Sequence, residues 1–141
     1  MKKITTLLLL LIALIIQINA QNIADTPPMG WMSWNQFEGD ISEDILKELA
    51  DAMVETGLAE AGYVLLSIDD HWEGGRTADG YLYPDSTKFP NGMKVVGDYL
   101  HSKGLKFGIY TDIAEYTCGG EVGSYGFEEN DANSFAEWGV D

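Results

Sequence analysis

Hydrophobic and polar positions along this chain repeat one pattern three times: an amphipathic helix, then a glycine, then a short apolar run. Apolar residues at helical spacing predict three helices, over residues 42–54, 93–100 and 131–138. Nearly continuous apolar runs at 63–68 and 105–110 have the length of strands that are covered on both faces. Val140 and Asp141 would open the next strand. The pattern therefore predicts repeated helix–strand units.

Two of these helices carry further signals. Ser42 stands before Glu43 and Asp44, and acidic residues in the first turn stabilise a helix N-terminus. In the last helix, the residues expected to face the core are Ala132, Phe135 and Ala136.

An opening strand over residues 29–35 follows the stiff lead Thr26-Pro27-Pro28. Strands and helices then alternate, which favours a parallel sheet with right-handed crossovers. Such a sheet is either doubly wound or closed into a barrel, and periodicity does not separate these two architectures.

The positions of polar and aromatic residues favour the barrel. They follow the carboxyl end of each predicted strand: Trp34, then Asp69 and Asp70, then Tyr110 and Asp112. In a (β/α)8 barrel this rim is the active face. We therefore expect the N-terminal part of such a barrel, about three βα units and the start of a fourth strand. The long segment 72–90, which shows no helical pattern, is expected to wall the binding site.

The N-terminus has the form of a secretory signal peptide. Lys2 and Lys3 precede the apolar run 7–16, which is well short of the roughly 20 residues that span a bilayer. Residues 1–20 are thus predicted to be removed after Ala20, leaving 21–141 exported to the periplasm or the medium; an uncleaved anchor is the alternative.

Composition excludes several classes of partner and site. With a formal charge of −15, the chain repels phosphate backbones and anionic lipids, so neither nucleic acid nor a membrane is expected as a partner of the exported part. His71 and His101 show no paired metal-ligand spacing, so we expect no metal and no cofactor. Cys118 is the single cysteine, either a free thiol or one whose partner lies outside this sequence.

Seven motifs, in order, now identify a family. They are Thr26-Pro27-Pro28-Met29-Gly30-Trp31, Ser33-Trp34-Asn35, Ile68-Asp69-Asp70, Lys88-Phe89-Pro90-Asn91-Gly92, Gly108-Ile109-Tyr110, Thr117-Cys118 and Phe135-Ala136-Glu137-Trp138-Gly139-Val140-Asp141. Together they resemble glycoside hydrolase family 27, the retaining α-galactosidases and α-N-acetylgalactosaminidases. The resemblance implies a (β/α)8 catalytic domain of which residues 21–141 are the N-terminal portion.

The resemblance also implies where the chemistry lies. Both catalytic carboxylates of that family are aspartates beyond the position of Asp141, so none is expected in this chain. Asp69 and Asp70 are poor candidates for the pair, because adjacent strand residues point to opposite faces, whereas retaining hydrolysis needs two carboxyl groups about 5 to 5.5 Å apart.

The substrate-binding residues that the resemblance implies are Trp34, Asp69, Asp70, Tyr110 and Cys118. Trp34 would lie against the sugar ring, the two aspartates would accept hydrogen bonds from its hydroxyls, and Tyr110 would line the pocket. From the residues alone, a capping or solvated Asp pair and a packed Trp or Tyr remain open. By resemblance, Cys118 would form a disulfide with a cysteine just beyond the nucleophile.

The function expected is hydrolysis of terminal α-galactosyl groups from galactose-terminated saccharides, by an α-galactosidase-type enzyme of which this chain holds the substrate-binding half. One alternative is a β-L-arabinopyranosidase of the same family, decided by contacts near Asp70 and the segment 72–83. A second is a secreted carbohydrate-binding module without catalysis. The sequence leaves the oligomeric state open.

Overall fold

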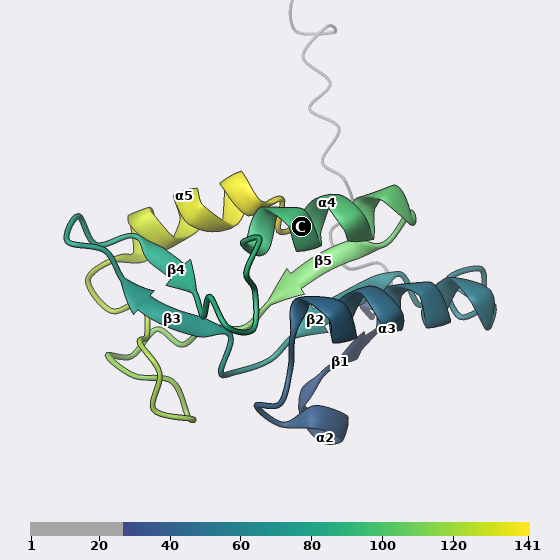
Figure 1. Cartoon of the computed structure of the whole chain (residues 1–141), viewed down its shortest axis with the longest axis horizontal. Coiled ribbons are helices and arrows are strands. Elements are labelled where there is room, and N and C mark those ends of the chain that lie inside the picture. Colours follow the sequence, from purple (N-terminus) through teal and green to yellow (C-terminus); the bar gives the residue numbers. More distant parts are fainter. Residues whose placement is uncertain (1–26) are drawn as a thin grey trace, which may run out of the picture.

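A computed structural model describes residues 27–141, in which three parallel strands form one sheet. The strands β1 (Gly30–Met32), β2 (Leu65–Ile68) and β5 (Lys106–Ile109) lie side by side in the order of the sequence. Helix α3 (Glu43–Glu55) joins the first pair, and α4 (Met93–Ser102) joins the second (Figure 1). The parallel sheet predicted from the sequence is thus confirmed.

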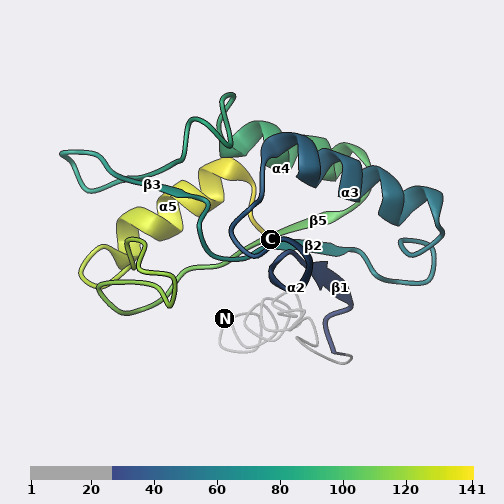
Figure 2. The ribbon, with the colours of Figure 1, turned by 60° about the horizontal axis from the view of Figure 1, so that its bottom comes forward.

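Both connecting helices cover the same face of the sheet. Helices α3 and α4 contact each other, and Figure 2 shows them together above the strands. A doubly wound sheet places helices on both faces, whereas a barrel keeps them all outside. The arrangement is that of the first units of a (β/α)8 barrel, which confirms the expected fold class.

Helix α3 begins where its sequence signals predict. The Ser42 hydroxyl accepts a hydrogen bond from the Ile45 amide at 3.3 Å. Glu43 is buried, and its carboxylate accepts hydrogen bonds from Lys47 Nζ at 2.6 Å and from Asn91 Nδ2 at 3.1 Å. This carboxylate therefore joins the start of α3 to the loop that leads into α4.

The opening strand is shorter than the predicted 29–35, because the chain turns at Ser33 into the short helix α2 (Trp34–Phe37). The predicted strands 63–68 and 105–110 are likewise trimmed to β2 and β5. Gly108 of β5 has the side chain of Ser67 within 2.7 Å of where its Cβ would stand, so only glycine fits between the strands here.

Helix α5 (Glu128–Trp138) begins three residues before the predicted start and presents a different face. Ala132 and Ala136 are exposed, so the expectation that they face inward is wrong. The buried positions are Asp131 and Ser134, with Phe135 half-buried beside them. The cause is an ion pair that apolar periodicity cannot reveal: Arg76 donates to both carboxylate oxygens of Asp131, at 2.5 and 2.7 Å.

The segment 72–90 contains a hairpin that the sequence did not predict. Strands β3 (Glu73–Arg76) and β4 (Leu82–Pro84) pair antiparallel, and β4 contacts α5. Both strands are very short, and because two of the four residues of β3 are glycines, the sequence shows no alternation of apolar and polar residues there. As expected, no helix forms in this segment.

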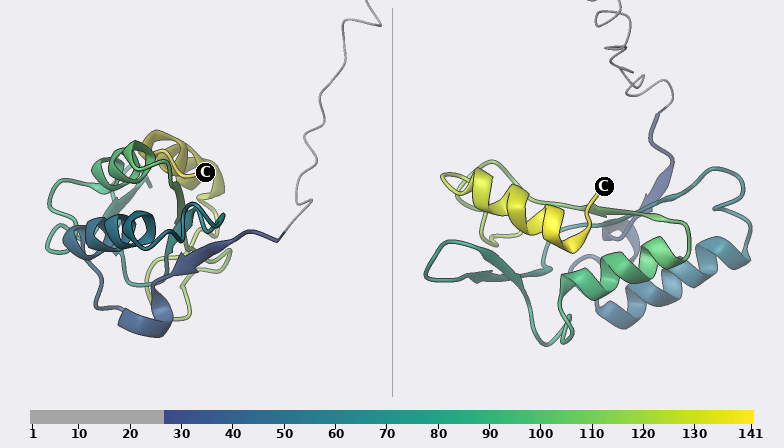
Figure 3. Two further views of the ribbon diagram at one scale, coloured as in Figure 1. Left: turned by 90° about the vertical axis from the view of Figure 1, so that its right-hand side faces the viewer. Right: turned by 90° about the horizontal axis from the view of Figure 1, so that it is seen from above.

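The core lies between the sheet and the helices, which follow one another as α3, α4 and α5 in the view from above (Figure 3). Three tryptophans pack in this core or against it. Trp72 is fully buried, while Trp31 and Trp138 are half-buried against the core.

After α5 the chain returns to β5, where the Asp141 amide donates to the Phe107 carbonyl at 2.9 Å. This contact lies where the sequence predicts the next strand.

The predicted signal peptide, residues 1–20, lies outside the described residues, so its cleavage stays a prediction. Among residues 27–141, every helix is too short or too polar to cross a membrane.

Candidate functional site

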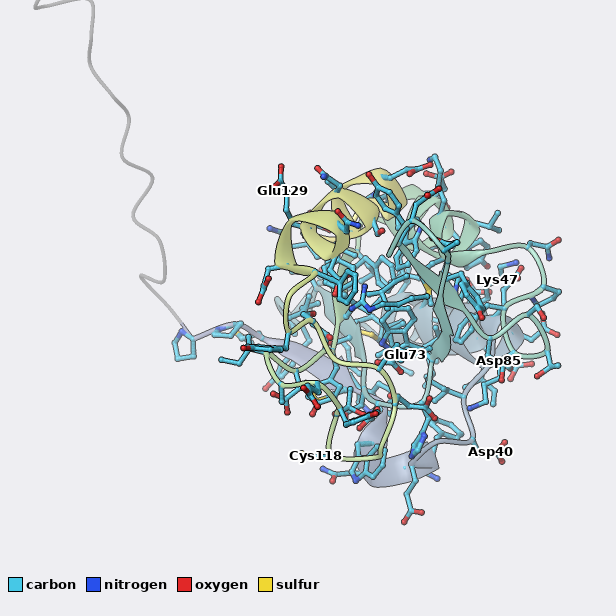
Figure 4. The ribbon with its side chains drawn as sticks, turned by 90° about the vertical axis from the view of Figure 1, so that its left-hand side faces the viewer. Asp40, Lys47, Glu73, Asp85, Cys118 and Glu129 are labelled. Carbon is cyan, nitrogen blue, oxygen red and sulfur yellow. The ribbon has the colours of Figure 1, made fainter. Side chains whose placement is uncertain are left out.

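The carboxyl ends of the three parallel strands converge on one pocket of about 330 Å³. Its walls are Trp34, Asp69, Asp70, Tyr110, Cys118 and Gly119. All five side chains that the sequence analysis selected are among them, although they come from three separate segments, each of which follows one of the parallel strands. Figure 4 shows Cys118 on the loop that follows β5, at the rim of the molecule. Asp112, expected at the same rim, does not line the pocket.

Ser33 fixes the ends of β1 and β2 relative to each other. Its side chain is fully buried, and its hydroxyl accepts a hydrogen bond from the Asp69 amide at 2.9 Å. Its own amide donates to the Ser67 carbonyl at 3.2 Å. The residues that follow, Trp34 after β1 and Asp69 after β2, are therefore held at one side of the pocket.

Asp70 is the buried carboxylate of the pocket, with 2% of its surface exposed. One oxygen accepts hydrogen bonds from the His71 amide at 2.9 Å and the Thr117 hydroxyl at 2.8 Å. The other accepts from the Gly119 amide at 2.7 Å. A carboxylate offers about four acceptor positions, so Asp70 holds the loop after β5 in place and keeps little capacity for a ligand.

Asp69 is in a different situation. It is half-buried, and its Oδ1 accepts from the Asp70 amide at 2.9 Å. Within residues 27–141 no donor contacts its Oδ2. Both aspartates line the pocket although they are neighbours, since the chain leaves β2 at Ile68 and turns through a left-handed residue, His71, with φ of 70°. Asp69 is the stronger acceptor for a ligand.

Trp34 and Tyr110 supply the aromatic part of the walls. Trp34 is 37% exposed and lies nearly parallel to the His71 ring, with centroids 5.9 Å apart and an interplanar angle of 18°. Tyr110 lies beside the Cys118 side chain, which together with burial raises the pKa of the Tyr110 phenol to about 12. The phenol is thus neutral at all ordinary pH values and able to donate or accept a hydrogen bond. Cys118 is an exposed free thiol.

Segment 72–90 does not wall this pocket, contrary to the expectation from its length and composition. Its contribution is indirect, since the buried Trp72 indole donates to the Tyr110 carbonyl at 2.8 Å and supports that wall from behind. The hairpin faces a second hollow of about 280 Å³ instead. Arg76, Tyr116, Tyr125 and Phe127 are among the residues that line it.

Sequence reasoning missed Glu73, a buried carboxyl group beside the pocket. It is 5% exposed, and neither side-chain oxygen has a hydrogen-bond partner in the described part of the chain. Figure 4 shows it inside the fold. Burial, together with the negative charges of Asp70 and Glu121, raises the pKa of Glu73 to about 8. A single glutamate in a polar segment looks solvated, so the sequence carried no signal for it.

Two other supports of the pocket, Thr117 and Gly119, also escaped the sequence analysis as functional positions. Their importance comes from hydrogen bonds to Asp70 across 47 and 49 residues of sequence. In residues 27–141, no group of three His, Cys, Asp or Glu side chains is arranged to hold a metal ion.

Comparison with known proteins agrees with this geometry. A profile of the family described as "Alpha galactosidase A" matches residues 26–141. The chain is 52% identical to a Dictyostelium discoideum protein named "Probable alpha-galactosidase", over 100% of this chain and 37% of that protein. It covers about a third of the length of the curated relatives that it matches.

Two solved structures superpose well. Alpha-galactosidase I from Mortierella vinacea has a TM-score of 0.84 and 40% identity, covering 86% of this chain and 31% of that one. Alpha-galactosidase from Saccharomyces cerevisiae, solved with raffinose, has a TM-score of 0.81 and 48% identity, covering 82% of this chain and 26% of that one.

Proposed function

The chain belongs to the alpha galactosidase A family, glycoside hydrolase family 27, and we propose that it forms the galactose-binding half of the active-site pocket of a retaining α-galactosidase. The observation that carries this proposal is the convergence of Trp34, Asp69, Asp70 and Tyr110 on one pocket. These side chains come from the ends of three successive strands, which is where barrel enzymes bind their substrates.

The chemistry of the walls suits a sugar. Galactose presents hydroxyl groups on its edges and an apolar patch of C–H groups on one face. The Trp34 indole offers a flat apolar surface for that patch, and Asp69 Oδ2 offers an acceptor for a hydroxyl. Hydrogen bonds to a charged group contribute about 1.5–3 kcal/mol each, so a hydroxyl of the wrong configuration would be rejected.

The catalytic pair, in this proposal, lies outside the present sequence. A retaining enzyme needs one carboxylate free to attack the anomeric carbon and a second to protonate the leaving oxygen. Asp70 is occupied by three hydrogen bonds from the protein, which leaves it unsuited to attack. In this proposal Asp69 binds the sugar, Asp70 holds the surrounding loop in position, and the nucleophile and acid/base are expected beyond Asp141.

We propose a galactose-terminated saccharide as the substrate, in line with the relative solved with raffinose, a trisaccharide that ends in an α-galactosyl group. We further propose that residues 1–20 export the protein to the periplasm or the medium, and that Cys118 pairs with a cysteine beyond Asp141. An exposed thiol beside a substrate pocket would otherwise be open to oxidation.

The test uses the protein expressed from its complete reading frame. It should hydrolyse p-nitrophenyl α-galactoside, and proton NMR should show α-galactose as the first product. Residues 21–141 alone should give no turnover. Preference for p-nitrophenyl β-L-arabinopyranoside would replace the proposed specificity, and galactose binding without any hydrolysis would identify a binding module instead.

Trp34→Ala in that protein should weaken inhibition by galactose about tenfold. Tyr63→Ala is the matched control, because Tyr63 is an exposed aromatic residue, 41% against 37% for Trp34, that does not line the pocket. Equal galactose inhibition in the two variants would contradict the placement of the sugar.

A further inference from the structure

His71 has a backbone conformation that only strong contacts maintain. Its φ of 70° is in the left-handed region, which is strained for a non-glycine residue. Lys88 Nζ donates to the His71 carbonyl at 2.7 Å and to the Gly39 carbonyl at 2.9 Å. The His71 amide donates to Asp70 at 2.9 Å. Two hydrogen bonds, one to the His71 carbonyl and one from its amide, thus hold the backbone of this residue, and the bond to Gly39 fixes the Lys88 ammonium that makes the first of them.

The imidazole fills the space between two walls of the pocket. It is stacked with an offset beside the Trp34 indole, with centroids 5.9 Å apart, and its Nδ1 is 3.0 Å from Glu121 Oε1. A Cβ at Gly39 would stand 2.7 Å from the ring, and so would a Cβ at Gly119. The ring therefore contacts both the loop after α2 and the loop that carries Cys118, while 31% of the side chain stays exposed.

We propose that His71 is a positioning residue of the sugar pocket, whose imidazole links the Trp34 indole to the loop formed by residues 117–121 and holds both at the spacing that galactose requires. This inference rests on the proposed function, because galactose is its probe. His71 itself does not line the pocket, so its effect is exerted through the residues that do.

Trp34 needs such support because its own element supplies little. Helix α2 has four residues, none of them buried, and its N-cap residue Ser33 makes no side-chain capping bond. A helix this short does not hold its shape unaided. The stacked imidazole, from the segment that follows β2, is thus a contact that restricts the indole.

The other wall is connected to the same ring. Glu121, which contacts His71 Nδ1, lies in a tight loop in which the Thr117 amide donates to the Glu121 carbonyl at 2.9 Å. The Glu121 amide donates to the Thr117 hydroxyl at 3.0 Å, and that hydroxyl donates to Asp70. A continuous set of contacts therefore runs from Trp34 through His71 and Glu121 to Asp70.

His71→Gly separates positioning from folding stability. Glycine relieves the left-handed backbone and keeps the Lys88 hydrogen bond, so the melting temperature should not fall, while the ring is lost. In the protein expressed from its complete reading frame, galactose should bind about 3- to 10-fold more weakly. KM for the p-nitrophenyl galactoside should rise by the same factor with kcat little changed, since uniform binding is what is lost.

His71→Phe restores a ring without the Nδ1 contact and should recover part of the affinity. His101→Ala is the matched control, because this second histidine lies on α4 and does not line the pocket. Unchanged galactose affinity in His71→Gly would overturn the inference, as would a loss matched by a lower melting temperature and not recovered by phenylalanine. If the wild-type protein bound no galactose at all, the proposed function would fail instead.

Discussion

Glu73→Gln gives a quantitative test of the buried carboxyl group beside the pocket. Glu73 is 5% exposed, with both oxygens lacking a donor among residues 27–141, and Asp70 and Glu121 add negative charge around it. Burial is the largest cause that raises its pKa from 4.5 to about 8. Glutamine has nearly the same shape and no charge at any pH, so the substitution removes only the ionisation.

The direction and the size of the effect of pH on the free energy of unfolding follow from proton linkage. Between pH 4.5 and 8 the folded protein keeps the Glu73 proton, whereas the unfolded chain has lost it. The free energy of unfolding must therefore fall as the pH rises through this window, by on the order of 5 kcal/mol in total. The contribution of Glu73 is fully present below pH 4.5 and lost above about pH 8. Glu73→Gln has no such dependence.

The assay compares melting temperatures of the wild-type protein and Glu73→Gln at pH 4.5, 6, 7 and 8. Other titrating groups cancel in the difference, and any packing defect of glutamine is the same at every pH. The variant should gain stability relative to the wild type as the pH rises. A difference that stays constant from pH 4.5 to 8 would refute the assignment of a protonated Glu73.

Three further predictions concern the pocket and its supports. Asp69→Asn should change the free energy of unfolding by no more than about 0.5 kcal/mol, because the amide oxygen of asparagine can still accept a hydrogen bond from the Asp70 amide. The same substitution should weaken galactose binding at least tenfold. Unchanged binding would contradict the role of Asp69 Oδ2. Asp70→Asn should instead lower the free energy of unfolding by about 2–3 kcal/mol, since the Gly119 and Thr117 donors lose a charged acceptor; a stable Asp70→Asn protein in chemical denaturation would show that these bonds matter little. Mass spectrometry of the full protein should find Cys118 in a disulfide; a thiol that reacts with an alkylating reagent without prior reduction would oppose that pairing.

The sequence predicted the architecture well because burial controls it. Apolar runs such as 63–68 and helical spacing such as 42–54 reflect faces that must be covered, and those requirements act locally. The convergence of Trp34, Asp69 and Tyr110 followed from strand order and from the motifs, since parallel strands share one carboxyl edge.

What the sequence did not predict depends on long-range polar contacts. The inward face of α5 is set by the Arg76–Asp131 ion pair, and charged residues score as solvent-facing in any apolar pattern. The hairpin in 72–90 consists of strands too short to show alternation. The burial of Glu73 and the hydrogen bonds of Asp70 to Thr117 and Gly119 likewise require knowledge of which distant segments meet.

The most direct test of the account is a crystal structure of the full protein with galactose. We predict one galactose in the pocket lined by Trp34, Asp69, Asp70 and Tyr110, with its C–H face on the indole and a hydroxyl within hydrogen-bond distance of Asp69 Oδ2. Galactose bound elsewhere, or an empty pocket at a saturating concentration of the sugar, would contradict the central claim.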